Sequence, residues 1–108
     1  MQINIQTNGF NAKANLKVYI NEKIGKLSRY YSEIIAGKVT LRLNNSDTKE
    51  NKLCEIRLAI PGNDLMASSH CRTFEEAVLN AVEILQGQIR RKKAKIMGAR
   101  NDNAPQIL

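Results

Sequence analysis

Six basic residues and no acidic residue lie between positions 90 and 100 of this chain. Five of them fall within six consecutive positions and are called here the helix-end cluster: Arg90, Arg91, Lys92, Lys93 and Lys95. Residues 1–89 carry 11 basic and 9 acidic side chains, so most of the net charge of +7 is concentrated in this segment. Guanidinium and ammonium groups at such density suit the phosphates of nucleic acid, because each can neutralise one backbone charge. The cluster therefore predicts a local site for a large anion, with nucleic acid the favoured ligand.

The competing interpretation is that these charges simply cover a solvated helix face. Cations near a helix C-terminus are also favoured by about 0.3–1 kcal/mol through the helix macrodipole. However, an apolar stripe at helical spacing runs up to the cluster, through Phe74, Ala77, Val78, Ala81, Leu85 and Ile89. Lys92 occupies the next core position, and at about 100° per residue the side chains of residues 90–93 point in four directions. We therefore expect the end of this helix to project beyond the core, which favours a binding site.

A second, weaker basic patch is predicted on an earlier helix. Lys23, Lys26 and Arg29 are three residues apart, so they lie along one flank of that helix beside its apolar stripe. Taken alone, such charges are more often solvated than functional. If the two helices pack side by side, this patch would merge with the helix-end cluster into one surface.

The binding mode is indicated by the aromatic residues. The chain has five, and none falls in a predicted strand, so a sheet platform for stacking bases is not expected. Contacts by point charges favour recognition of RNA shape and backbone over base sequence. Binding through five or six phosphates would depend strongly on salt.

Residues 54, 70 and 71 invite a metal or nucleophile interpretation, which their spacing does not support. Cys54, His70 and Cys71 are all possible zinc ligands. His70 and Cys71 are adjacent in a predicted strand and point to opposite faces, so they cannot easily share a metal or act as a nucleophile pair. We expect two reduced core cysteines and a surface histidine. The sequence predicts no catalytic constellation, no metal, no cofactor and no small-molecule substrate, and hence no enzyme.

The elements that position the basic residues follow from hydrophobic periodicity. Alternating apolar and polar residues predict strands over residues 2–6, 38–43, 54–60 and 65–71. Turn sequences at residues 8–9, 44–47 and 61–64 punctuate these segments. A helix is predicted from an N-cap at Asn11 to about Tyr31, with Gly37 ending the segment. The order is then β-α-β-β-β, with the basic helix still to follow.

The basic helix has a clear predicted start. Thr73 and Glu76 fit a capping box, with Thr73 as the N-cap. The helix is predicted to run to about Met97, where Gly98 stops it. The resulting β-α-β-β-β-α order favours one α+β domain, a two-layer sandwich of a four-stranded sheet with two helices on one face.

The remaining composition bounds where such a domain acts. No apolar run approaches the roughly 20 residues of a membrane span, so no membrane association is expected. Met1 leads straight into a strand pattern, which indicates that a signal peptide is absent. Two cysteines make no disulfide framework, so a cytoplasmic protein with reduced thiols is expected.

Over about residues 1–97 the chain resembles the ribosome hibernation-promoting factors, also called ribosome-associated inhibitors or Y proteins. The resemblance is carried by the element order, by residues 21–31 (NEKIGKLSRYY), by residues 67–78 (ASSHCRTFEEAV) and by the basic end of the second helix. It implies a bacterial protein related in shape to double-stranded-RNA-binding domains. Such a protein would bind the rRNA of the small ribosomal subunit between head and body, and would block the decoding channel of mRNA and tRNA in idle ribosomes.

The family's functional residues carry over to named positions. Its first-helix lysines match Lys23 and Lys26, and its second-helix basic residues match Arg91, Lys93 and Lys95, which Arg90 and Lys92 extend. The chain departs from the family at Arg72 and Phe74, where an acidic residue and a tyrosine are common, and at Ser32-Glu33. Long members carry a further domain that joins two ribosomes. We expect here a ribosome-binding domain over residues 1–97, a flexible tail over 98–108 and no such dimerising domain.

Two other interpretations stay open. A general RNA-binding domain would use the same patch on free duplex RNA, and would bind naked helices as tightly as assembled subunits. A protein-interaction module would bind an acidic partner, as an older label for the family, sigma-factor modulators, suggests. That module would form a stable complex in nuclease-treated extract.

Overall fold

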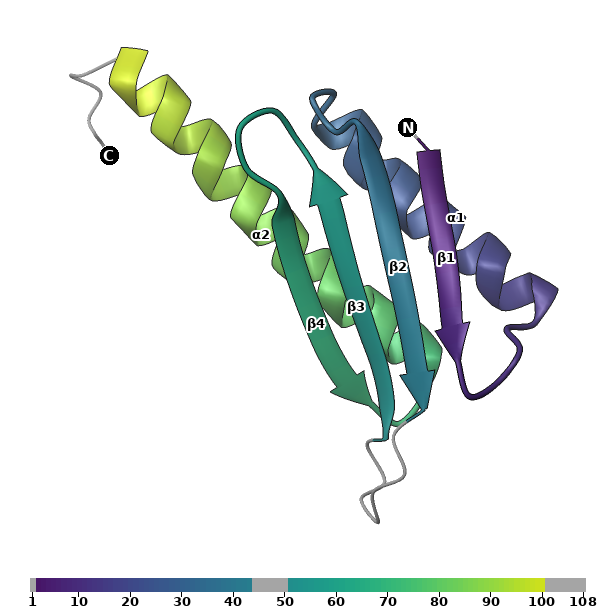
Figure 1. Ribbon diagram of the computed structural model, residues 1–108. Helices are drawn as coiled ribbons and strands as arrows, with labels where there is room; N and C mark the ends of the chain where they lie inside the picture. Colours follow the sequence, from purple (N-terminus) through teal and green to yellow (C-terminus); the bar gives the residue numbers. More distant parts are fainter. Residues whose placement is uncertain (1, 44–50, 101–108) are drawn as a thin grey trace.

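The computed structural model describes residues 2–43 and 51–100, with side chains described as far as residue 94. The elements are β1 (Gln2–Asn8), α1 (Ala14–Tyr30), β2 (Ala36–Leu43), β3 (Lys52–Ala59), β4 (Leu65–Cys71) and α2 (Phe74–Arg100). The four strands form one sheet in the order β1-β2-β3-β4, and both helices cover the same face of it (Figure 1). The predicted β-α-β-β-β-α order and two-layer α+β architecture are confirmed.

The sheet is mixed, and its register sorts the side chains into two faces. β1 pairs with β2 in parallel, which requires the crossover that α1 supplies, and β2-β3-β4 pair antiparallel. The helix-facing side chains include Val39, Leu41, Cys54, Ile56 and Leu58, all with no exposed surface. A slip of one residue would turn these side chains to solvent, so burial fixes the register.

Both helices bury one apolar stripe against the sheet. The stripe of α1 is Leu16, Ile20, Ile24 and Leu27, and that of α2 is Ala77, Val78, Ala81, Leu85 and Ile89. Each buried leucine or isoleucine contributes about 1.5–3 kcal/mol. The predicted stripe of α2 is thus confirmed from Ala77 onward. Phe74 is only half-buried and stacks on Phe10, with ring centroids 4.5 Å apart, which ties the start of α2 to the loop after β1.

The N-cap of α2 was predicted correctly and that of α1 was not. The backbone N–H of Glu76 donates to Thr73 Oγ1 at 3.1 Å, as a capping box requires. Asn11 does not cap α1, which begins three residues later behind Lys13 with no side-chain cap hydrogen bond. The cause lies in the tertiary fold. Residues 11–13 connect the edge of the sheet to the helical layer, so the helix begins only after them (Figure 1).

Two glycines were also misjudged. Gly37 does not end a segment; it is buried inside β2, opposite Ile3 and Leu58 in the register. Gly98 does not stop α2, which continues to Arg100. A glycine costs a helix only about 1 kcal/mol relative to alanine, which does not terminate one.

The turns at Gly9 and Gly62 are confirmed, because both glycines have positive φ, +89° and +95°. The predicted turn at residues 44–47 and the tail from residue 101 lie outside the described residues.

Candidate nucleic-acid interface

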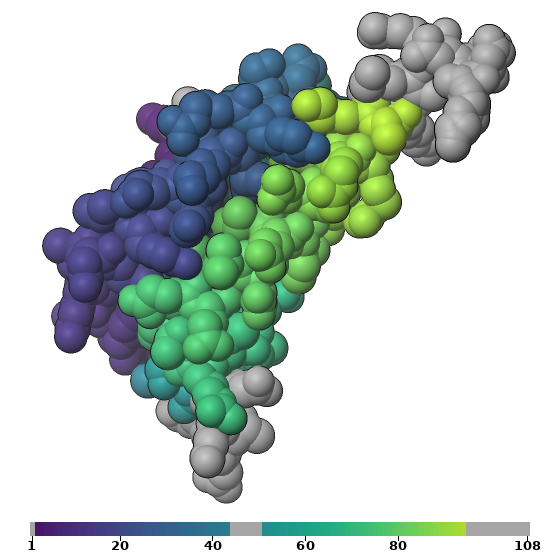
Figure 2. All heavy atoms as spheres, turned by 180° about the vertical axis from the view of Figure 1, so that it is seen from behind, coloured from purple at the N-terminus to yellow at the C-terminus, as the bar shows by residue number. Residues whose placement is uncertain are grey.

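The two helices run side by side in the same direction across the sheet. At their N-terminal ends Phe10, just before α1, stacks on Phe74 of α2, and near their C-terminal ends Tyr30 of α1 meets Lys93 of α2. Figure 2 shows α1 in blue and α2 in green next to each other on this face. Both negative ends of the helix macrodipoles therefore lie at the same end of the molecule, where the basic residues are.

A groove of about 210 Å³ follows the line between the helices. Its walls include Lys23, Lys26 and Tyr30 from α1, and Leu79, Glu83 and Gln86 from α2. The groove places Lys23 and Lys26 of the α1 patch beside the middle of α2, so the two helices pack side by side, the arrangement for which the sequence predicted one merged surface.

Lys93 joins the two patches. Its Nζ donates to the backbone carbonyl oxygen of Tyr30 at 3.2 Å and lies 4.3 Å from the centroid of the Tyr30 ring. That carbonyl is among the last of α1, where helical N–H partners run out. Lys93 therefore caps α1 from another helix and adds a cation–π contact to its ring. The sequence singled out Lys93 as a free cation and did not predict this role.

The other cations of the two patches differ in exposure. Lys23 is half-buried, with Nζ 5.3 Å from the Tyr19 ring centroid, in keeping with the tendency of lysine stems to lie along apolar surface. Lys26 and Arg29 of α1 are exposed, as are Arg90 and Arg91 of α2, whereas Lys92 is half-buried. The side chain of Lys95 lies outside the described part of the chain. Among the described side chains, none of these cations forms an ion pair.

Gly87 is a feature that the sequence analysis overlooked. A Cβ at Gly87 would lie 3.6 Å from a guanidinium nitrogen of Arg91 and 3.8 Å from one of Arg90. Both guanidinium groups therefore lie over the same position of the helix, where Gly87 has no side chain. Two adjacent guanidinium groups, neither paired to a carboxylate in the described structure, form a fork suited to phosphate oxygens.

The last turns of α2 extend past the end of the sheet, as predicted (Figure 1). Among the described side chains of α2 the last buried one is Ile89, and residues 90–94 are exposed or half-buried. Within the described structure, the hydrogen bond from Lys93 to the Tyr30 carbonyl is the polar contact between this end of α2 and α1. The basic end is therefore a continuation of a helix whose earlier turns are anchored in the core.

The thiols and the histidine do not form a site. Cys54 and Cys71 are buried and unpaired, while His70 is exposed, as predicted. Burial raises the pKa of the Cys54 thiol to about 12, and Cys71 and Glu55 add to the shift. Cys71 Sγ accepts a hydrogen bond from Asn80 Nδ2 at 3.1 Å. Within residues 2–43 and 51–100, no three His, Cys, Asp or Glu residues are placed to hold a metal ion.

No helix in the part of the chain that is described has the length and apolar character needed to cross a membrane.

The fold and this surface define a small α+β domain whose helical face is basic at one end. Residues 3–97 match the family described as Sigma 54 modulation protein / S30EA ribosomal protein, and the chain belongs to that family.

Two curated relatives are both named ribosome hibernation promotion factor. The one from Deinococcus radiodurans is 30% identical over 111 residues, covering 100% of this chain and 58% of the relative. The one from Bacillus subtilis (strain 168) is 31% identical over 100 residues, covering 89% of this chain and 50% of the relative. The chain thus spans about half the length of the curated relatives it matches.

Two solved structures share the fold. A ribosomal subunit interface protein from Coxiella burnetii superposes with a TM-score of 0.77 at 19% identity, covering 87% of this chain and 99% of that one. The N-terminal domain of Thermus thermophilus Protein Y gives 0.73 at 23% identity, with 84% and 98% covered.

Proposed function

We propose that this protein binds the small ribosomal subunit, occupies the decoding channel where mRNA and tRNA would otherwise sit, and so holds idle ribosomes inactive. Membership of the family, with curated relatives named as ribosome hibernation promotion factors, supports the ribosome as the partner. The observation that carries the proposal is the meeting of basic residues from α1 and α2 at one end of the helical face, with Lys93 joining them.

The mechanism requires no catalytic step. Lys26, Arg29, Arg90 and Arg91 are exposed and would bind rRNA phosphates, the arginines through two N–H groups each. Lys93 would hold α2 against α1 and fix the spacing between the two sets of cations. Because phosphates are contacted rather than bases, recognition would follow the shape of the folded rRNA.

The projecting end of α2 suits an RNA-lined channel. An α-helix with its side chains is about 10–12 Å wide and keeps its backbone groups hydrogen-bonded, so it can enter a narrow space without unfolding. Inhibition would follow from occupancy: phosphates bound by this helix, and the volume it fills, are denied to mRNA and tRNA.

The experiment that tests this is co-sedimentation of the purified protein with small subunits, with whole ribosomes and with mRNA-loaded ribosomes, at low and moderate salt. We expect saturable one-to-one binding that mRNA and tRNA displace. Weak, unsaturable binding that salt removes equally from ribosomes and from free duplex RNA would reduce the protein to a general RNA binder. A stable complex with an acidic protein in nuclease-treated extract, without ribosome binding, would favour a protein-interaction module.

A further inference from the structure

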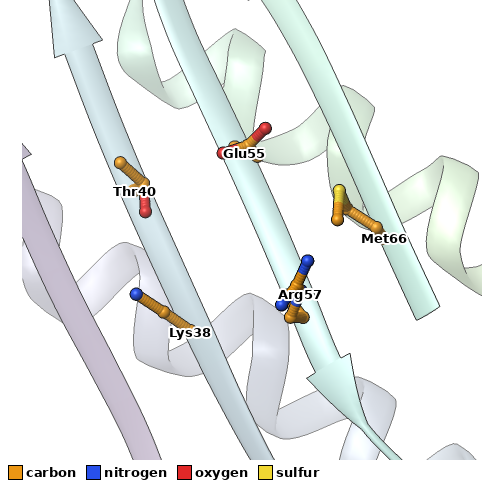
Figure 3. A pocket seen from close by; sticks show the side chains of 5 residues that line it. All are labelled: Lys38, Thr40, Glu55, Arg57 and Met66. Atoms are coloured by element: carbon orange, nitrogen blue, oxygen red, sulfur yellow. The ribbon is translucent and has the colours of Figure 1, made fainter. Parts of the chain in front are cut away.

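The face of the sheet opposite the helices is uncovered. No element of the described chain lies over it, and Figure 3 shows side chains of β2, β3 and β4 standing in front of the strands with the helices behind. Alternate residues of each strand point to this face, because side chains alternate along a strand. Its chemistry is therefore fixed by the register.

The edge strand β1 presents only amides to this face. Gln2, Asn4, Gln6 and Asn8 alternate with the inward Ile3, Ile5 and Thr7, and all four amides are exposed. Asparagine is disfavoured in strands, so this run is not explained by strand propensity. Each amide offers both donors and acceptors without charge, the groups with which proteins contact phosphate and sugar oxygens alongside their cations.

Cations stand directly beside these amides on β2. Asn4 pairs with Lys38 and Asn8 pairs with Arg42, four residues further along. At roughly 3.3 Å per residue the two amide–cation pairs are about 13 Å apart on the surface. Figure 3 shows the Lys38 side chain extending from β2 toward β1. The β1–β2 half of the face thus forms a polar strip with no acidic side chain.

Further into the sheet, Lys38 stands opposite a second cation. Lys38 and Arg57 are direct cross-strand partners, and like charges placed directly opposite each other destabilise a sheet. A hollow of about 200 Å³ lies over this pair, with Thr40, Glu55 and Met66 completing its lining (Figure 3). Arg57 approaches Asp64 at 4.0 Å, but both side chains are about half exposed, so the ion pair offsets little. Repulsion within this pair would be relieved by a bound anion.

We propose that the open sheet face is a second contact surface for RNA backbone, so that the protein is held between two RNA segments. Lys38 and Arg42 neutralise phosphates there, and the β1 amides bond to phosphate and sugar oxygens. The inference rests on the proposed function and extends it: the helical face binds one wall of an RNA-lined site and the sheet face binds another.

An acidic protein partner fits this face less well. Stable protein interfaces are centred on large apolar or aromatic anchors that become fully buried. Within the described strands this face carries the exposed Met66 and the half-buried Leu53 as large hydrophobic side chains, and the amide strip has none. Amides, a hydroxyl and dispersed cations match the sugar–phosphate backbone.

The decisive variant is Lys38→Gln/Arg42→Gln in the full chain, titrated against small ribosomal subunits over a series of salt concentrations. We expect binding roughly tenfold weaker, and a plot of log affinity against log salt shallower by about two ionic contacts. The matched control is Lys13→Gln/Lys17→Gln, which removes the same charge from two exposed positions at the start of α1. The control should stay within about twofold of the unmodified protein.

Each other outcome has a definite meaning. Unchanged affinity and slope for the sheet variant, while Arg90→Gln/Arg91→Gln loses binding, would overturn the sheet-face surface and leave the proposed function standing. Equal weakening by the sheet variant and its control would reduce the effect to overall charge, which also overturns it. Normal binding by the Arg90→Gln/Arg91→Gln variant would instead count against the proposed function itself.

Cross-linking identifies the occupant directly. A Gln6→Cys variant carries a photoactivatable thiol reagent on the amide strip, and the natural thiols Cys54 and Cys71 are buried and compete poorly for it. In the complex with small subunits we expect cross-links to rRNA. Cross-links to a ribosomal protein alone would replace RNA with a protein as the occupant, and no cross-link, with the same reagent at Arg90→Cys reacting, would leave this face free and refute the proposal.

Discussion

The helical face and the open sheet face both carry uncompensated cations, but they arrange them differently. On α2, Arg90 to Lys93 are consecutive, so the charges crowd around one helix end, and Lys93 is engaged by Tyr30. On the sheet, Lys38 and Arg42 are four residues apart on β2 and lie directly opposite Asn4 and Asn8 of β1. Crowded charges give a strong, salt-sensitive attraction, whereas spaced charges with neutral hydrogen-bonding partners favour one geometry of the ligand.

The two faces are alike in that their cations lie outside the buried core. The last buried residue among the described side chains of α2 is Ile89, directly before the helix-end cluster, so the described cluster charges can be removed without opening the core. The sheet cations sit on β2, whose opposite face includes the buried Val39 and Leu41, and their own side chains point away from the core. Variants that separate binding from stability are therefore available on both sides.

Neutralising the helix-end cluster should have the largest effect. The variant Arg91→Gln/Lys92→Gln/Lys93→Gln/Lys95→Gln should bind small subunits at least 100-fold more weakly, because the variant loses four cations that bind phosphates or hold α2 against α1. Its thermal unfolding midpoint should stay within a few degrees, since the core stripe is untouched. Co-sedimentation and circular dichroism measure the two quantities. Binding unchanged in a folded variant would contradict the helix-end cluster as an rRNA contact, and with it the observation that carries the proposed function.

Reversing one sheet charge should come next, and it should move stability and binding in opposite directions. Lys38→Glu replaces a like-charged pair with Arg57 by an opposite-charged one, so the free energy of unfolding should rise by about 0.2–1 kcal/mol. Affinity for small subunits should fall more than tenfold, because a carboxylate replaces an ammonium group that binds phosphate. Denaturant unfolding and titration give both values. A loss of stability here would show that Lys38 and Arg57 do not repel each other.

Lys93→Met should distinguish a positioning role from a phosphate contact. We expect a loss of affinity of about threefold to tenfold with no change in the salt slope, because the ammonium is engaged with Tyr30 rather than with RNA. Arg90→Gln is the matched comparison and should lower the slope by about one. A slope lowered equally by both variants would place Lys93 among the phosphate ligands, as the sequence alone suggested.

The smallest effect is expected at Gly87. Gly87→Ala should raise the free energy of unfolding by up to about 1 kcal/mol, because alanine favours a helix and its Cβ meets only ordinary contacts at 3.6 and 3.8 Å. Affinity should change by about twofold or less, since the arginine side chains can shift. Destabilisation would mean that the guanidinium groups of Arg90 and Arg91 are held rigidly over this point.

Local patterns in the sequence were enough to find all six elements and the layer order. Thr73 was recognisable as a cap because its partner, Glu76, is three residues away. Asn11 and Gly37 were misjudged because tertiary packing outweighed local preference, and Gly98 because one glycine costs a helix too little to end it. The sequence therefore predicted the fold better than the exact ends of the helices.

The candidate sites were predicted only where their residues are close in sequence. The helix-end cluster was visible as a run, whereas the contact of Lys93 joins it to a backbone carbonyl 63 residues earlier. The amides of β1 and the cations of β2 are separated in the chain by all of α1, so only the strand register shows that they form one strip. Residues brought together by pairing leave no local pattern.

One consequence of the charge order along α2 concerns the first encounter with a partner. Its early turns carry Glu75, Glu76 and Glu83, two of which reinforce the effect of burial in raising the pKa of Tyr19, and its end carries the cations. With α1 parallel to it, the molecule has a long-range electric moment along its helices. The electric field of a polyanion exerts a torque on such a moment, and this torque turns the molecule before contact. The basic end would arrive first, and low ionic strength would lengthen the distance over which this rotation acts.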